Sequence, residues 1–129
     1  MRRFGFSVIE VDQKHGFDLG VLENQKLVKG LISSGLITTV HLGTPCSSFS
    51  RARERGGGPG ALRSDDHPLG RPGFKSIDQL QVTNGNRLAR FSFTIQQLCY
   101  SLGVAACMEN PAASRIWQMP QALRLCQRP

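Results

Sequence analysis

The spacing of apolar residues between positions 88 and 102 is the feature that most restricts how this chain can fold. These residues recur at intervals of three or four, which places them on one face of a helix: Leu88, Phe91, Ile95, Leu98 and Leu102. Gly103 follows, in the position where a glycine commonly ends a helix. Residues 104–108 then predict a strand that runs into Glu109. The segment therefore predicts a helix that ends immediately before a strand.

The same alternation is predicted upstream. Residues 6–12 are rich in β-branched residues and predict a short strand, and residues 24–34 have the apolar spacing of a helix that ends at Gly35. Residues 36–42 predict a second strand. Strand, helix, strand, helix, strand is the order of a mainly parallel α/β sheet, and 129 residues suffice for one domain.

A long segment from about residue 51 to residue 75 interrupts this order. Glycines and prolines prevent a regular element there, and five arginines make it basic: Arg51, Arg53, Arg55, Arg63 and Arg71. Asp65 and Asp66 within it predict a solvated turn. A loop of this length inside a domain is usually functional or disordered, and both interpretations stay open, as a flexible nucleic-acid-binding loop or as a disordered basic linker.

Charge and cysteine usage limit the environment of the chain. The net charge of +7 favours polyanionic partners. No stretch approaches 18 consecutive apolar residues, so no membrane span is predicted. The four cysteines form no CxxC pair, which favours a reducing, intracellular compartment and argues against a disulfide framework or a zinc site: Cys46, Cys99, Cys107 and Cys126. Nucleus and cytoplasm are not distinguished.

Reactive side chains follow each predicted strand. Glu10 and Asp12 end the first strand, Cys46 follows the second, and Glu109 follows the third. In open parallel sheets, ligands and catalytic groups gather beyond the carboxyl ends of the strands. We therefore expect these side chains to lie at one edge of the sheet.

Cys46 lies in a segment suited to a nucleophile. Pro45 fixes the backbone before the thiol, and small polar residues follow it. The thiolate is the reactive form, and backbone N–H groups and arginines in the following loop favour it. A buried cysteine at a strand end is the alternative that the local pattern leaves open.

Residues 43–50, Gly-Thr-Pro-Cys-Ser-Ser-Phe-Ser, resemble the nucleophile motif of cytosine-C5 DNA methyltransferases, Gly-x-Pro-Cys-x-x-Phe-Ser, at every fixed position. Glu109-Asn110 resembles the Glu-Asn-Val motif of this family, with Pro111 in place of the valine. The resemblance extends over roughly residues 5–117. It implies an incomplete Rossmann-like, S-adenosylmethionine-dependent methyltransferase sheet.

The resemblance also implies a mechanism. Cys46 would add to carbon 6 of cytosine while Glu109 hydrogen-bonds the ring, so that carbon 5 attacks the methyl group of S-adenosylmethionine. The target base would have to leave the helical stack, with DNA as the expected partner and RNA not distinguished from it. Four residues would hold the cofactor: Glu10, Asp12, Asp18 and Pro45. Five residues would contact the nucleic acid: Ser50, Arg51, Arg53, Arg55 and Arg63.

Several motifs of the family are missing from the sequence. The Phe-x-Gly-x-Gly cofactor turn, the Gln-x-Arg-x-Arg strand, the target-recognition region and the closing motif are not found. Without the strand that precedes the cofactor turn, residues 6–12 and 36–42 would either pair directly or expose apolar edges. We therefore expect a fragment, a degenerate copy or one half of a split enzyme that needs a complementary methyltransferase fragment and is inactive alone.

Two other functions are compatible with the sequence. The first is a non-catalytic nucleic-acid-binding remnant of a methyltransferase, which would use the basic loop. The second is an unrelated thiol enzyme in which His41 or His67 activates Cys46. The thiol enzyme predicts a histidine within hydrogen-bond reach of Cys46 and gives Glu109 no role.

Overall fold

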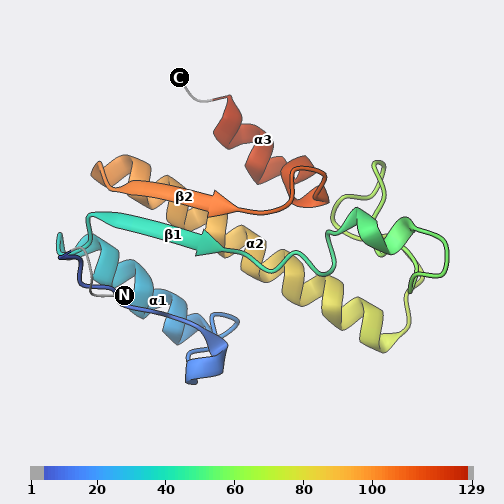
Figure 1. Cartoon of the computed structure of the whole chain (residues 1–129), viewed down its shortest axis with the longest axis horizontal. Coiled ribbons are helices and arrows are strands. Elements are labelled where there is room, and N and C mark those ends of the chain that lie inside the picture. The colour runs from blue at the N-terminus through green and yellow to red at the C-terminus, as the bar shows by residue number, and fades with distance from the viewer. Residues whose placement is uncertain (1–4, 128–129) are drawn as a thin grey trace.

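A β-α-β unit forms the centre of the structure, a computed structural model in which residues 5–127 are described (Figure 1). Its two strands are β1 (Thr39–Gly43) and β2 (Ala105–Glu109), and the helix between them is α2 (Ser76–Leu102). Helix α1 (Leu22–Ser33) precedes the unit and α3 (Pro120–Cys126) follows it. The described residues thus form a mixed helix and strand structure around a two-stranded parallel sheet, a partial α/β fold.

The register of the sheet aligns the ends of its two strands. Thr39 pairs with Ala105 at the start, and Gly43 pairs with Glu109 at the end. Helix α2 returns the chain to the start of the sheet and ends at Gly103, whose φ of +69° places it in the left-handed region. The predicted helix end and the parallel order of the last two strands are therefore confirmed.

Two clusters of apolar side chains hold these elements together. The first joins Ile32 of α1 to Phe91 and Ile95 of α2, and the half-buried Val40 and Leu42 of β1 pack against it. Helices α1 and α2 consequently cover one face of the sheet, and α2 passes behind both strands in Figure 1. The second cluster joins α2, α3 and the loop after β1: Phe49, Ala89, Phe93, Ile116, Met119 and Ala122.

The central part of the apolar face predicted for residues 88–102 is confirmed as a packing surface of α2, whereas Leu102 at its end is 47% exposed. Phe91 and Ile95 are buried in the first cluster, and Leu98 packs against it. The helix starts at Ser76, twelve positions before Leu88, the first residue of the predicted apolar face. The predicted helix at residues 24–34 corresponds to α1, with Gly35 at a φ of +79° just after its end.

The predicted strand at residues 6–12 is wrong. These residues form no regular element and pair with neither strand of the sheet. Phe6, Val8 and Ile9 expose 73%, 65% and 62% of their surface. β-Branched residues favour a strand only where a neighbouring strand and a packed surface receive them, and this segment finds neither. The second strand also starts later than predicted, at Thr39, and leaves Leu36 exposed.

Within residues 5–127, no helix is both long enough and apolar enough to cross a membrane.

Candidate active site at the end of the parallel sheet

The segments that carry Cys46 and Glu109 leave the sheet at the same edge. Glu109 is the last residue of β2 and lies opposite Gly43, three positions before Cys46. The Asn110 side chain donates a hydrogen bond of 2.8 Å to the carbonyl of Thr44, which joins the two segments just beyond the strands. Both predicted catalytic residues therefore belong to one edge, as the strand order required.

The two side chains differ in their surroundings. Cys46 is half-buried, and the neighbouring Pro45 is exposed. The side chain of Glu109 is 74% exposed, and its Oε2 lies 3.8 Å from Nε2 of His41. The edge is thus open to solvent on the side of Glu109, so the structure offers reactive groups at an accessible rim.

The backbone after Cys46 is held firmly in place. The N–H of Phe49 donates to the carbonyl of Cys46 at 2.9 Å, which closes a turn around the thiol. Phe49 itself is fully buried in the cluster with α2 and α3. Before the turn, the hydroxyls of Thr44 and Ser92 lie 2.6 Å apart, which ties the end of β1 to α2. Residues 44–50, called the nucleophile loop after the role predicted for Cys46, are therefore a fixed element.

Arg63 is the main support of the nucleophile loop, which corrects its predicted role as a DNA contact. Its side chain is 1% exposed and makes five hydrogen bonds inside the protein. It donates to the carbonyl of Ser48 at 3.0 Å and to the Ser48 hydroxyl at 2.9 Å, and it reaches the carbonyl of Pro68 at 2.7 Å. A guanidinium used in this way has no free donors for phosphate.

The charge of Arg63 is retained despite its burial. Burial lowers the pKa of Arg63 to about 10, which leaves it protonated near neutral pH. The guanidinium carbon lies 3.6 Å from the centre of the Phe49 ring, so a cation–π contact adds to the hydrogen bonds. Bonds to Asn86 at 2.7 Å and to the carbonyl of Val82 at 3.3 Å connect it to α2. One side chain thus links the nucleophile loop, the basic loop and the long helix.

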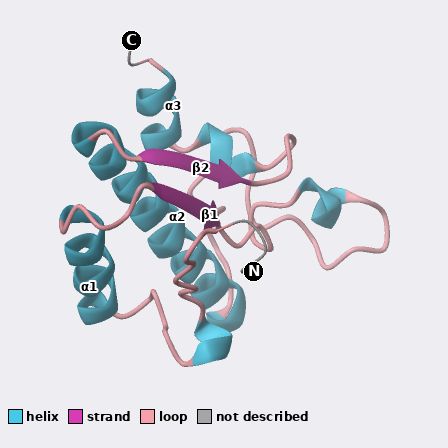
Figure 2. Ribbon diagram, turned by 60° about the vertical axis from the view of Figure 1, so that its left-hand side comes forward, coloured by secondary structure: helices cyan, strands magenta, loops and turns pink. Residues whose placement is uncertain are grey.

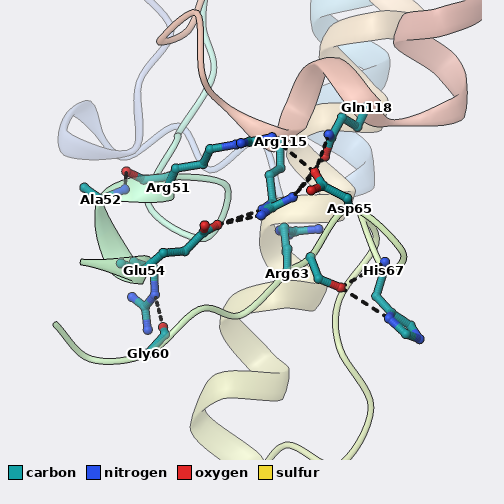
Figure 3. A network of polar contacts seen from close by, with 12 residues as sticks. Arg51, Ala52, Glu54, Gly60, Arg63, Asp65, His67, Arg115 and Gln118 are labelled. Atoms are coloured by element: carbon teal, nitrogen blue, oxygen red, sulfur yellow. Dashed lines mark hydrogen bonds and ion pairs between the residues drawn. The ribbon is translucent and has the colours of Figure 1, made fainter. Parts of the chain in front are cut away.

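A second arginine, Arg115, fastens the start of the basic loop to the segment after β2 (Figure 3). Its side chain is 7% exposed, and it donates to Oε1 of Glu54 from two nitrogens at 2.7 and 3.0 Å. It also pairs with Asp65, which accepts a further bond of 2.8 Å from Gln118. Arg51 approaches the same carboxylate at 3.1 Å. Asp65 therefore anchors the loop although its side chain is 67% exposed, and the predicted solvated turn at Asp65 and Asp66 is confirmed.

Sequence reasoning did not identify Arg115, because its partners are far away in the chain. Glu54 and Asp65 are 61 and 50 positions distant. The only sequence signal for this ion pair was the presence of isolated acidic residues within a basic segment. That signal does not indicate which arginine pairs with them.

The ion pair between Asp65 and Arg115 predicts an acid-sensitive loop. The hydrogen bond from Gln118 and then the one from Arg115 lower the pKa of Asp65 from its ordinary value of 3.8. A lowered carboxylate pKa adds stability above the unfolded-state value and loses it as the pH falls through the folded-state value. We therefore expect amide hydrogen exchange in residues 51–65 to be slower in the wild type than in Asp65→Asn above the ordinary carboxyl pKa of 3.8, and this difference to disappear as the pH falls below that value. Equal exchange at every pH would contradict the anchor.

The remaining predicted DNA contacts lie at the start of the basic loop. Ser50 begins the 3-10 turn Arg51–Glu54, and its hydroxyl accepts from the N–H of Ala52. Arg53 donates to the carbonyl of Gly60 at 3.0 Å, and Arg55 is exposed. The loop predicted as flexible is thus braced at several points, and Arg51, Arg53 and Arg55 remain at its surface.

The acids predicted to hold a cofactor are engaged in local contacts. Glu10 pairs with Lys14 at 2.9 Å, and the hydrogen bond from Lys14 lowers the pKa of Glu10. Asp12 caps a short turn by accepting from the N–H of Lys14, and Asp18 accepts from the N–H of Gly20. No contact of the described residues links these acids to Cys46. Glu10 and Asp12 were expected at the end of a strand, and because residues 6–12 form no strand, no sheet fixes them at the edge.

A groove of about 540 Å³ lies between α1 and α2, away from Cys46 and Glu109. Lys29, Arg87 and Arg90 contribute three cationic side chains to its lining, and the ring of Phe91 also borders it. No carboxylate is part of this lining. The groove therefore has the charge to receive an anion, and it had no counterpart in the sequence analysis.

The histidines do not support Cys46 as the thiol of an unrelated enzyme. Nδ1 of His67 lies 3.3 Å from the Ser64 hydroxyl, and Nδ1 of His41 lies 3.1 Å from the sulfur of Cys107. Within residues 5–127, no hydrogen bond joins a histidine to Cys46. The unrelated thiol enzyme therefore lacks the contact between a histidine and Cys46 that it predicted.

The chain matches no protein-family model, and comparisons with curated proteins and with solved structures likewise find no match. The class of protein that the structure defines is a partial α/β fold with reactive groups at one edge of a parallel sheet.

Proposed function

We propose that this chain is a cytosine-C5 DNA methyltransferase-like domain in which Cys46 is the nucleophile and Glu109 its acid partner. The observation that supports it best is the shared edge: Cys46 follows β1, Glu109 ends β2, and the bond from Asn110 to Thr44 joins the two segments. The match of residues 43–50 to the nucleophile motif supplies the chemistry.

The proposed reaction starts with addition to the pyrimidine. The Cys46 thiolate forms a bond to carbon 6, and the electron pair of the C5–C6 double bond moves into the ring. Glu109, in its protonated form, would donate a hydrogen bond to N3 and so stabilise the negative charge that develops there. S-adenosylmethionine would supply the methyl group that carbon 5 attacks, and loss of the C5 proton to a base would then expel the Cys46 thiolate and restore the C5–C6 double bond. An exposed Glu109 allows an extruded base to approach from solvent.

The proposal assigns a supporting role to the residues around the thiol. Phe49 and Arg63 hold the nucleophile loop against α2, so the position of Cys46 is set before substrate arrives. Preorganisation of this kind reduces the entropy that has to be lost in the transition state. The acids Glu10, Asp12 and Asp18 are proposed cofactor contacts only once a complementary methyltransferase fragment completes the sheet beside them.

A duplex that contains 5-azacytosine tests the addition step without requiring the cofactor. Thiolate addition to carbon 6 moves the electron pair onto the ring nitrogen at position 5, which takes up a proton, so the adduct is the sum of protein and DNA. We expect intact-mass measurement to detect this adduct with the wild-type chain and not with Cys46→Ser. Glu109→Gln should slow its formation by roughly a hundredfold.

The matched control for this experiment is Cys126→Ser, because Cys126 is an exposed thiol outside the proposed site. Its adduct should form at the wild-type rate. An adduct that persists in Cys46→Ser would show that the nucleophile is wrongly assigned. Duplex that binds the wild-type chain without any adduct, even when excess DNA saturates the protein, would contradict the catalytic proposal.

Binding without an adduct would instead favour the second candidate, a non-catalytic nucleic-acid-binding remnant. The specific observation behind it is the groove between α1 and α2, where Lys29, Arg87 and Arg90 lie together without a carboxylate. Together with a net charge of +7, this groove could take the phosphate backbone.

A further inference from the structure

The face of the sheet opposite α1 and α2 carries a group of exposed reactive side chains. Alternate residues of a strand point to opposite faces, and Val40 and Leu42 point toward the helices. The other face is formed by six exposed residues: Thr39, His41, Gly43, Ala105, Cys107 and Glu109. Figure 2 shows both strands lying in front of α2, so the helix leaves this face open.

Register brings three of these residues together. His41 pairs directly with Cys107, and Gly43 pairs with Glu109. The Glu109 side chain passes over Gly43, where an added Cβ would lie 3.7 Å from its Oε1, and reaches back toward His41. Nδ1 of His41 lies 3.1 Å from the sulfur of Cys107, and Nε2 lies 3.8 Å from Oε2 of Glu109. The imidazole thus has a thiol on one ring nitrogen and a carboxylate on the other.

This order of groups activates a thiol. The nitrogen that faces the sulfur can accept its proton, and the carboxylate at the other nitrogen stabilises the imidazolium that results. Within residues 5–127, no group of three or more such side chains is placed to hold a metal ion.

We propose that Cys107, with His41 as its base and Glu109 as the group that orients His41, is a site of thiol–disulfide exchange with low-molecular-weight disulfides. The proton of the Cys107 thiol passes to Nδ1 of His41. The thiolate attacks one sulfur of the disulfide, the sulfur–sulfur bond of the reagent breaks, and the departing thiolate takes the proton back from His41. The products are a mixed disulfide on Cys107 and one free thiol.

The other cysteines of the chain provide the comparison. Cys126 is also exposed, and no contact of the described residues links it to a histidine. Cys99 is fully buried, and burial raises the pKa of its thiol. If exposure alone governed the reaction, Cys107 and Cys126 would react alike. The proposal requires Cys107 to be faster.

The proposal does not depend on the methyltransferase function, because its nucleophile is Cys107 and its product is a mixed disulfide. The two sites share Glu109, whose side chain lies between the edge of the sheet and its open face. A bulky group on Cys107 would therefore stand beside the proposed acid partner of Cys46. Modification of Cys107 would in this way obstruct the approach of a cytosine to Glu109.

The test uses the full chain and oxidised glutathione. The reaction is quenched with acid at set times, and the mixed disulfide at each cysteine is quantified by peptide mass spectrometry. We expect Cys107 to react at least roughly tenfold faster than Cys126 in the wild type. In His41→Phe the rate at Cys107 should fall to about that of Cys126, while the rate at Cys126 stays unchanged.

A second variant, Glu109→Gln, keeps the size of the side chain and removes its charge. It should slow the reaction at Cys107 by roughly threefold. Both substituted side chains are more than half exposed, so the fold is expected to survive, and circular dichroism checks this. Equal wild-type rates at Cys107 and Cys126 would overturn the proposal, as would an unchanged Cys107 rate in either folded variant.

Discussion

Arg63→Met is expected to lower the free energy of unfolding by about 3–5 kcal/mol, the largest effect of any single substitution considered for this chain. The methionine side chain fills part of the same space but has no hydrogen-bond donor. Five acceptors would lose the bond that Arg63 now gives them: the carbonyls of Ser48, Pro68 and Val82, the Ser48 hydroxyl, and Oδ1 of Asn86. Each unpaired buried acceptor costs about 1–3 kcal/mol, partly recovered when the site relaxes. Urea denaturation followed by circular dichroism measures the difference.

Arg55→Met is the matched control, because Arg55 belongs to the same loop and is exposed. Its effect should stay within about 0.5 kcal/mol. Arg63→Lys should also be clearly destabilised, since a single ammonium cannot reproduce bonds that a planar guanidinium makes in several directions. If Arg63→Met and Arg55→Met unfold at the same urea concentration, Arg63 does not support the nucleophile loop.

The elements that the sequence predicts well are those whose signal is local. The apolar spacing of residues 88–102 and the glycine after it predict the end of α2, and that helix then dictates a parallel return to the sheet. The position of Cys46 and Glu109 at one edge follows from the same rule, because it needs only the strand order. The strand predicted at residues 6–12 was wrong, because a strand requires a neighbouring strand to pair with, and a local pattern contains no information about that partner.

The supporting contacts of the candidate site depend on distances along the chain that no short pattern records. Arg63 contacts Ser48 from 15 positions away, and Arg115 contacts Glu54 from 61. In the sequence both arginines resemble surface cations, and only burial distinguishes them from Arg53 and Arg55. The same holds for His41 and Cys107, which are 66 positions apart and become neighbours through the register of the sheet. Local chemistry was therefore predictable, while the choice of partner was not.

Gly85→Ala is expected to lower the free energy of unfolding by about 1–3 kcal/mol, although helix propensity alone predicts the opposite. Gly85 lies within α2, where an alanine would ordinarily add up to about 1 kcal/mol. Its missing side chain lets the nucleophile loop pack directly on the helix. A methyl group there would overlap the Ser48 hydroxyl, and it would lie 3.1 Å from Nη2 of Arg63 and 3.3 Å from the Phe49 ring. Because the Ser48 hydroxyl is bonded to Arg63, moving it disturbs that support as well.

Gly30→Ala in α1 separates the two effects, because a methyl group at Gly30 meets nothing within 4 Å. This variant should be more stable than the wild type by about 0.5–1 kcal/mol, as propensity predicts. Thermal and urea unfolding of both variants then give shifts of opposite sign. Gly85→Ala should also make the Cys46 thiol react faster with a bulky alkylating reagent, since the loop around it loosens, whereas Gly30→Ala should leave that rate unchanged. Equal stabilisation of both variants would mean that the nucleophile loop does not pack against α2 at Gly85. In that case the packing that fixes the position of Cys46, on which the proposed chemistry depends, would be absent.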